Sequence, residues 1–117
     1  NMDARLIIQV LVNLINNAIK YTPENSNISL NARRVENKIL IEVQDDGNGV
    51  LHPDQLFEMF YTENNRGGDT RRGMGLGLSL CKSIIQSHGG TIWVENVTPH
   101  GACFKFVLDA VEVKLYE

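Results

Sequence analysis

LIIQVLVNLINNAIKYT, at residues 6–22, is the stretch that decides the fold. Its apolar residues recur every three or four positions, which predicts an amphipathic helix that Pro23 ends. Asn13 and Asn17 lie one turn apart on this helix and share a face, although asparagine is a poor helix former. Two interpretations stay open on this stretch alone: a solvated polar stripe, or an amide oxygen that coordinates a hard cation such as Mg²⁺.

The composition is that of one soluble globular domain. The chain has 117 residues, of which 43% are hydrophobic, enough for a core without stabilising cross-links. Its net charge of −3 argues against a protein that binds nucleic acid through phosphate contacts. Cys81 and Cys103 fall within apolar patterns, so we expect buried free thiols of a reducing compartment rather than a disulfide. We expect no signal peptide or membrane span, and because the chain opens almost directly into a helix we expect it to be a piece of a longer protein.

Alternating apolar residues at 28–35 and 38–43 predict two strands of an antiparallel hairpin. The second strand runs into Asp45-Asp46-Gly47-Asn48-Gly49. This segment is typical of an ordinary Asp-Gly loop. It would also suit a ligand site, in which Asp45 accepts a hydrogen bond from an exocyclic amine. The glycines at 47 and 49 would then let the backbone pass beneath a flat ring.

The middle of the chain is less regular. His52-Pro53-Asp54 predicts the start of a short helix, because proline is tolerated in a first helical turn. Phe57 and Phe60 share a face there, and we interpret them as packing residues. The polar segment YTENNRGGDTRR, at residues 61–72, is a long loop of the kind that often serves function. Its arginines could reach an anionic ligand.

GMGLGL, at residues 73–78, leads into a predicted helix over 79–88. A glycine-rich turn at a helix N-terminus suits phosphate, because backbone N–H groups point outward there. The segment has no Gly-Lys-Ser/Thr, so it is not a Walker A loop, and its spacing does not fit the dinucleotide fingerprint. Further strands are predicted at 91–95 and 103–108, with 111–115 as a last strand or a tail. The histidines and cysteines show neither zinc spacing nor a catalytic triad.

Four segments occur in a fixed order along nearly the whole chain: NLINNAIKYT, DDGNG, FEMFY and GMGLGLSL. Together they resemble the ATP-binding catalytic domain of sensor histidine kinases, in the GHKL (Bergerat-fold) superfamily shared with DNA gyrase, heat-shock chaperone and mismatch-repair ATPases. The segments GGTI, GACFKF and LCKSI are similar to potassium-responsive, KdpD-like sensor kinases. The resemblance implies that residues 1–117 form one two-layer α/β sandwich, with helices on one face of a mixed sheet and a lid over ATP.

The resemblance also implies a site for ATP and Mg²⁺. Asn17 would hold the metal ion, and Asn13, Asn17 and Lys20 would be catalytic. Asp45 would recognise adenine, and Ala102 stands where many relatives have a threonine near the base. The cofactor-binding residues that the resemblance implies are Asn17, Lys20, Tyr21, Asp45, Gly47, Gly49, Arg72, Gly73, Gly75, Leu76, Gly77 and Leu78.

Asn13 distinguishes branches of the superfamily, because hydrolysing members have a water-activating glutamate at that position. An amide cannot accept the proton, so transfer of a phosphoryl group to a partner is favoured over hydrolysis. No histidine of this chain lies in an acceptor context. The implied partners are therefore a helical histidine-acceptor and dimerisation domain, in the same chain or in trans, and a downstream response regulator.

For the full-length protein, the resemblance implies a homodimer whose cytoplasmic kinase part belongs to a membrane-anchored bacterial sensor. This domain itself would contact neither nucleic acid nor membrane. A switch ATPase and a catalytically silent nucleotide-binding interaction module remain the alternatives.

Overall fold

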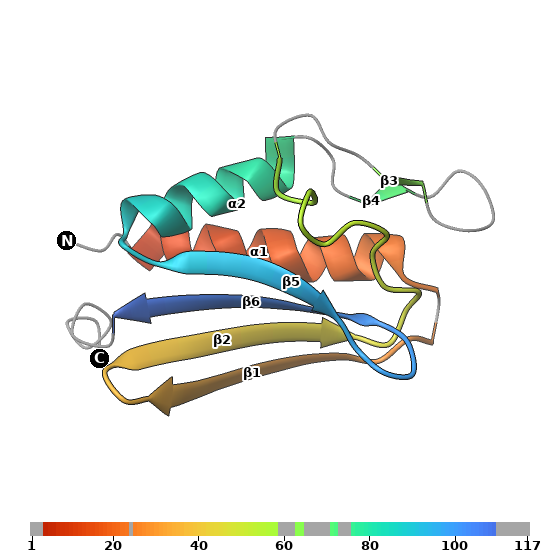
Figure 1. Ribbon diagram of the computed structural model, residues 1–117, viewed down its shortest axis with the longest axis horizontal. Helices are drawn as coiled ribbons and strands as arrows, with labels where there is room; N and C mark the ends of the chain where they lie inside the picture. Colours follow the sequence, from red (N-terminus) through yellow and green to blue (C-terminus); the bar gives the residue numbers. More distant parts are fainter. Residues whose placement is uncertain (1–3, 24, 59–62, 65–70, 73–75, 110–117) are drawn as a thin grey trace.

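The computed structural model describes residues 4–23, 25–58, 63–64, 71–72 and 76–109. Two helices, α1 (Ala4–Tyr21) and α2 (Leu76–Ser87), lie together on one face of a four-stranded sheet (Figure 1). The sheet strands are β1 (Ile28–Val35), β2 (Lys38–Asp45), β5 (Thr91–Asn96) and β6 (Ala102–Asp109). Two further short strands, β3 (Glu63–Asn64) and β4 (Arg71–Arg72), pair with each other outside that sheet. The predicted α/β architecture is therefore present.

The strand order of the larger sheet is β1-β2-β6-β5, and each neighbouring pair is antiparallel. The prediction of a mixed sheet is thus wrong for the described strands. Two hairpins, β1-β2 and β5-β6, build the sheet, and β6 runs antiparallel to β2 where the hairpins join. In this register Asp45 at the end of β2 pairs with Ala102 at the start of β6.

The expected helix after His52 is also wrong. Residues 51–58 form turns, in which Gln55 N donates to His52 O and Glu58 N donates to Gln55 O. These i→i+3 bonds do not continue into an α-helical ladder, and Pro53 has no N–H to donate. The other predicted helix and strands among the described residues match their positions closely, although α2 begins at Leu76 and so includes the end of the glycine-rich segment. The short strands β3 and β4 were not predicted, because they lie in the segment 61–72 that was expected to be a loop. Phe60 and the predicted element at 111–115 lie outside the described residues.

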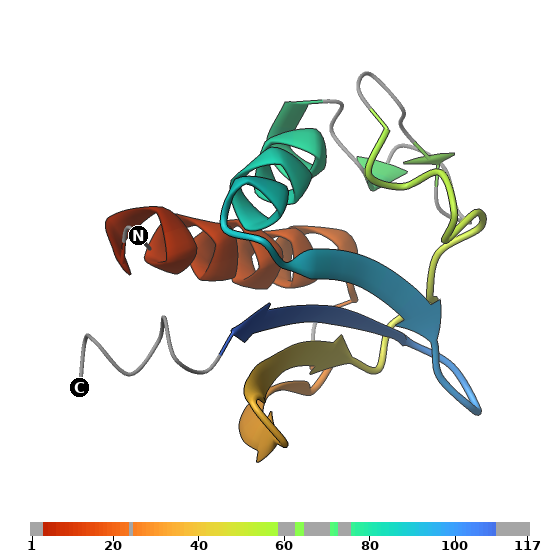
Figure 2. The same cartoon turned by 60° about the vertical axis from the view of Figure 1, so that its left-hand side comes forward.

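The helices and the sheet form two layers (Figure 2), and buried side chains from both layers make up the core. Leu14 of α1, Ile85 of α2 and Phe104 of β6 are fully buried in it, as the helical and alternating patterns require. Phe57 packs its ring edge-to-face against Phe104, with 6.1 Å between centroids, which confirms its packing role. Both cysteines are buried and free, as expected. Among the described residues, no helix is long and apolar enough to cross a membrane.

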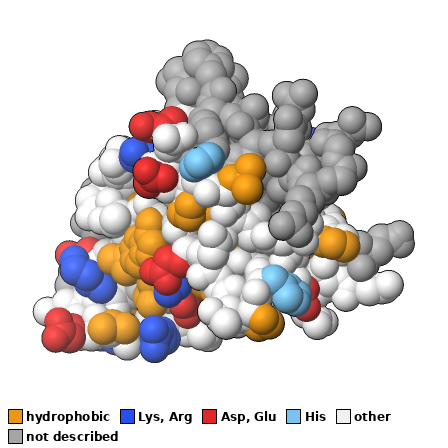
Figure 3. Space-filling view, turned by 45° about the vertical axis from the view of Figure 1, so that its right-hand side comes forward, with side chains coloured by type: hydrophobic (Ala, Val, Ile, Leu, Met, Phe, Trp, Pro, Cys, Tyr) orange, Lys and Arg blue, Asp and Glu red, His pale blue; other side chains and the backbone are white. Residues whose placement is uncertain are grey.

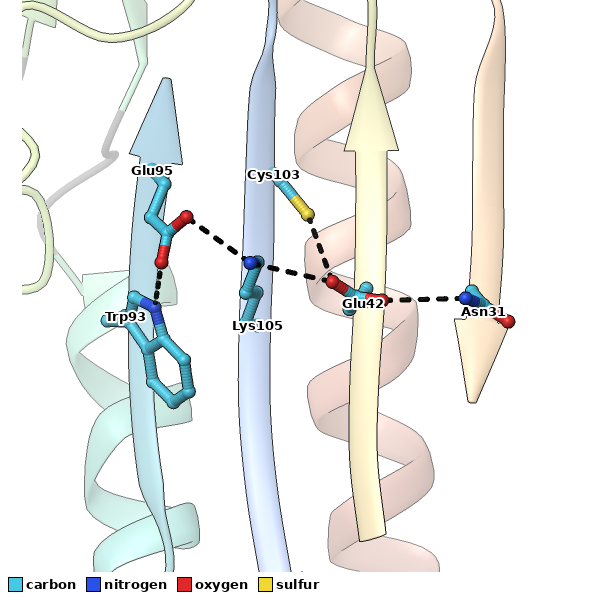
Figure 4. A network of polar contacts seen from close by, with 6 residues as sticks. All are labelled: Asn31, Glu42, Trp93, Glu95, Cys103 and Lys105. Carbon is cyan, nitrogen blue, oxygen red and sulfur yellow. Dashed lines mark hydrogen bonds and ion pairs between the residues drawn. The ribbon is translucent and has the colours of Figure 1, made fainter. Parts of the chain in front are cut away.

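The sheet face opposite the helices carries a polar network instead (Figure 4). Lys105 lies 3.2 Å from Glu95 and 3.5 Å from Glu42, and Trp93 Nε1 donates to Glu95 at 2.8 Å. The bond from Trp93, followed by that from Lys105, lowers the pKa of Glu95. Asn31 extends the network to β1 through its bond to Glu42. These contacts join all four strands across the face opposite the two described helices.

Candidate functional site

Asp45 is the most deeply buried carboxylate among the described residues, with 1% of its surface exposed. Its Oδ1 accepts hydrogen bonds from Gly47 N at 2.9 Å and from Ala102 N at 3.3 Å. A buried carboxylate requires such partners, because an unpaired charge there would be strongly destabilising. The end of β2 and the start of β6 therefore fix this side chain where the two strands meet.

The backbone around Asp45 is packed too closely for side chains at two glycines. A Cβ on Gly47 would lie 2.7 Å from Thr22 Cγ2 and 3.2 Å from Asp45 Oδ1. Gly101 has φ +119°, and a Cβ there would collide with the backbone carbonyl of Asp45. Thr22 directly follows α1, the asparagine-bearing helix, and its Oγ1 donates to Ala18 O at 2.6 Å. The fold thus brings the C-terminal end of α1 against the Asp45 loop.

Two side chains from the β5 end of the sheet hold this loop, and neither was predicted from the sequence as a site residue. Asn96 accepts from Val50 N at 2.7 Å and donates to Val50 O at 2.9 Å, directly after Gly49. His100 Nδ1 lies 3.1 Å from Gly47 O. The sequence indicates these roles only by an asparagine at a strand end and a histidine in a turn, and neither pattern is specific for a residue that holds a loop.

Asp46, next to Asp45, has a different task. Its carboxylate accepts from the backbone N of Asn27 at 2.7 Å and from the side-chain Nδ2 of Asn27 at 3.1 Å. These bonds close the connection that leads from α1 into β1. Asp46 therefore belongs to the scaffold, and the ligand role predicted for Asp45 stays a prediction.

On α1, Asn17 is buried, Asn13 is half-buried and Lys20 is exposed. Asn13 Nδ2 donates to the sulfur of Cys81 on α2 at 3.7 Å, which ties the two helices together. An amide oxygen is a suitable ligand for Mg²⁺, which is commonly held by one or two protein groups together with phosphates and water. The described residues contain no cluster of three or more His, Cys, Asp or Glu for a metal, but such a site needs none.

At the N-terminal end of α2, Gly77 is the first residue whose surroundings the structure describes. Gly77 is exposed, and a Cβ built on it would meet nothing within 4 Å. Backbone N–H groups of a first helical turn can bind an anion that approaches there. Leu78 was predicted to bind the cofactor, but its side chain is buried in the core. A ligand could therefore contact Leu78 only through its backbone. Donor groups for phosphate and an amide for a cation therefore lie on adjacent helices, so the chain fits Mg-ATP.

Several predicted site residues cannot be placed. Gly73 and Gly75 lie outside the described residues, as do the side chains of Tyr21, Arg72 and Leu76. The strand that contains Arg72, β4, does lie near α1. On the face seen in Figure 3, acidic and basic side chains of the described residues are interspersed with hydrophobic ones and form no continuous basic patch.

Residues 2–112 match the family described as histidine kinase-, DNA gyrase B-, and HSP90-like ATPase. The chain belongs to this family. Within this ATPase family it is a catalytic domain of the histidine kinase type, as its similarity to the solved catalytic domain of histidine kinase ThkA shows. The sensory kinase SasA of Crocosphaera subtropica is 46% identical over 110 residues, which cover 91% of this chain and 28% of SasA.

Sensor protein KdpD of Clostridium acetobutylicum is 40% identical over 108 residues, which cover 91% of this chain and 12% of KdpD. The predicted likeness to KdpD-like kinases is therefore confirmed, and SasA kinases are similarly close. The chain spans only a small part of the length of these relatives.

Solved structures of the ATPase family share the fold. The catalytic domain of histidine kinase ThkA superposes with a TM-score of 0.78 at 35% identity, over 93% of this chain and 70% of that one. Full-length ShkA in complex with AMPPNP superposes with a TM-score of 0.73 at 28% identity, over 88% of this chain and 21% of ShkA. The predicted family and α/β fold are thus confirmed.

Proposed function

We propose that this chain binds Mg-ATP and transfers its γ-phosphoryl group to a histidine on a separate helical domain. The observation that carries the proposal is the buried Asp45 carboxylate, held at the end of β2 by two backbone N–H groups. An acceptor in that place recognises the exocyclic amine of adenine. The solved complex of the relative ShkA with AMPPNP supports an adenine nucleotide as the ligand.

Each end of the nucleotide has its own residues. The base lies over Gly47 and Gly49, next to Asp45. Asn17 holds Mg²⁺, which neutralises phosphate charge during transfer. The start of α2 donates N–H groups to the phosphates. The remaining cofactor-binding residues of the proposal are Lys20, Tyr21, Arg72, Gly73, Gly75, Leu76, Gly77 and Leu78.

Asn13 favours transfer over hydrolysis. Its amide nitrogen already donates to Cys81, and an amide accepts no proton at neutral pH. A general base typically accelerates a reaction about 10²–10⁴-fold, so its loss leaves attack by water slow. Positioning and charge neutralisation, the main elements of phosphoryl transfer, do not depend on that base.

The partners follow from this chemistry. A helical acceptor and dimerisation domain supplies the histidine, and a response regulator receives the phosphoryl group next. The relative ThkA was solved in complex with the response regulator TrrA, which supports such a partner. We place the domain on the cytoplasmic side of a membrane-anchored sensor that works as a homodimer.

The proposal is tested by following both possible fates of the γ-phosphate. We expect the purified chain with Mg-ATP to release almost no free phosphate. Adding the helical acceptor domain of its own kinase should produce an acid-labile, base-stable phosphoprotein, as phosphohistidine is, and Asn17→Ala should abolish it.

Two results would contradict the proposal. Phosphate release that survives Asn13→Ala and disappears with Asn17→Ala would mean that the domain is a switch ATPase with another base. Tight Mg-ATP binding without any phosphotransfer would instead support a silent nucleotide-binding interaction module.

A further inference from the structure

Cys81 occupies an unusual place between the two helices. It lies on α2, is fully buried and packs within the hydrophobic core. Its sulfur nevertheless accepts a hydrogen bond from the half-buried Asn13 Nδ2 at 3.7 Å. This polar contact is directed to the helix that carries the proposed magnesium ligand.

This contact fixes which end of the Asn13 amide faces α2. A carboxamide is planar, with two N–H donors on one branch and an acceptor oxygen on the other. When the nitrogen points to the sulfur, the oxygen points away from it. An aliphatic residue at 81 would leave a partly buried N–H without this acceptor, and the two orientations of the amide would then be closer in free energy.

We infer that Cys81 is a positioning residue, whose sulfur holds the Asn13 amide so that its oxygen is the atom left to face the magnesium-bound nucleotide. The inference rests on the proposed function. The water molecules around Mg²⁺ are hydrogen-bond donors, so they need an acceptor and are repelled by an NH₂ group. A fixed amide presents the oxygen before the ligand arrives, and no reorientation is required on binding.

The chemical state of the thiol agrees with this role. Burial raises the pKa of Cys81 to about 11, while the bond from Asn13 acts in the opposite direction. The sulfur is thus a neutral acceptor at physiological pH. We therefore expect the bond from Asn13 to persist across that range.

Calorimetric titration of the 117-residue chain with ATP tests the inference, in Mg²⁺ and again in excess EDTA. Cys81→Val keeps the bulk of the side chain and removes the acceptor; Cys81→Ala serves if the valine variant does not fold. We expect Mg-ATP binding to weaken about three- to tenfold, which is the effect of one neutral hydrogen bond. Binding in EDTA should change little, because the amide oxygen acts toward the hydrated metal.

Cys103→Val is the matched control, since Cys103 is also buried but faces Glu42 on the other side of the sheet. This variant should bind Mg-ATP as the wild type does. The variant Asn13→Ala completes a double-mutant cycle with Cys81→Val. Because Cys81 acts through Asn13, the double variant should bind no more weakly than Asn13→Ala alone.

Three results would overturn the inference: unchanged binding by Cys81→Val, equal weakening with and without Mg²⁺, or additive losses in the double variant. A chain that binds no Mg-ATP at all would refute the proposed function instead. Even then, NMR of the nucleotide-free chain tests the positioning bond. The side-chain NH₂ of Asn13 should exchange slowly in the wild type and faster in Cys81→Val, and rapid exchange in both would refute it.

Discussion

Gly101 determines how closely the turn between β5 and β6 approaches the site. Its φ of +119° lies in a region that side chains rarely adopt, and its Cα faces the backbone of Asp45. Its carbonyl accepts from Val97 N at 3.0 Å, which closes the turn. The neighbouring Ala102 N can then reach the Asp45 carboxylate. The position of the Asp45 carboxylate thus depends on the absence of a side chain at Gly101.

Gly101→Ala should therefore lower both stability and nucleotide affinity. A strained backbone costs about 1–3 kcal/mol, and the collision with the Asp45 carbonyl adds to that. Gly89→Ala is the matched control, because Gly89 also has positive φ, +75°, but has open space around it. Urea unfolding and ATP titration of both variants check this. If Gly89→Ala loses as much nucleotide affinity as Gly101→Ala, the loss does not come from the Asp45 contact.

At this scale, the sequence identified Asp45 and the asparagine pair but not the residues that hold them. Asp45 was recognisable because it precedes two glycines in a known order of motifs. Cys81 contacts Asn13 across 68 positions, and Asn96 contacts Val50 across 46. Such pairings depend on how distant elements pack together, and a local sequence pattern carries no information about that packing. The ligand-binding roles of these residues stay predictions.

Among the elements, β5 secures the loop that follows β2. Asn96, its last residue, both accepts from and donates to the backbone of Val50. Gly49 passes close by, and a Cβ there would lie 2.6 Å from Asn96 Oδ1. The edge strand therefore acts on the proposed base-binding loop through one amide side chain. This makes the loop part of the sheet scaffold.

Asn96→Ala should destabilise the chain by about 1–3 kcal/mol, because two backbone groups of Val50 lose their partner. ATP affinity should fall as well, since the loop that carries Gly47 loses its anchor. Asn96→Asp retains the acceptor for Val50 N but lacks the donor for Val50 O. Its stability and ATP affinity should therefore lie between those of the wild type and those of Asn96→Ala. Thermal unfolding and ATP titration measure both quantities. An unchanged affinity in Asn96→Ala would show that the loop is positioned independently of β5.

Element positions were predictable where periodicity is strong. The helix at α1 and the hairpin β1-β2 were found from spacing alone, within a few residues of their observed ends. The antiparallel order of the whole sheet was not, because strand pairing between distant hairpins is set by packing on the helices. The helix predicted after His52 is absent because a proline and a short apolar run are compatible with a single turn and do not require a second one.

For the molecule as a whole, the buried thiols predict a loss of stability in alkali. Burial raises the pKa of Cys81 from 9.0 to about 11, and burial together with Glu42 raises that of Cys103 to about 11. The unfolded chain loses these protons first. The stabilising contribution is therefore complete below pH 9 and declines as pH rises toward about 11.

For Cys81, two pKa units correspond to at most about 3 kcal/mol. Urea unfolding across that pH interval should show a steeper decline for the wild type than for Cys81→Ala. Parallel declines in the two proteins would mean that the thiol ionises as easily in the folded chain as in the unfolded one.

The central claim is that Asp45 recognises the base of ATP, and Asp45→Asn tests it most directly. Asparagine keeps Oδ1 for the N–H groups of Gly47 and Ala102 but replaces the other carboxylate oxygen with an NH₂ donor. Adenine presents an amine donor, whereas hypoxanthine presents a carbonyl acceptor in the same place. The preference for ATP over inosine triphosphate should therefore decrease or reverse in this variant.

Asp46→Asn is the control, because Asp46 holds Asn27 and should affect stability without changing base preference. The measurement is calorimetric titration of the three proteins with Mg-ATP and with magnesium inosine triphosphate. We expect the wild type and Asp46→Asn to prefer ATP by at least about tenfold, the contribution of a charge-assisted hydrogen bond, and Asp45→Asn to lose that preference. If Asp45→Asn binds ATP as tightly and as selectively as the wild type does, Asp45 does not recognise the base.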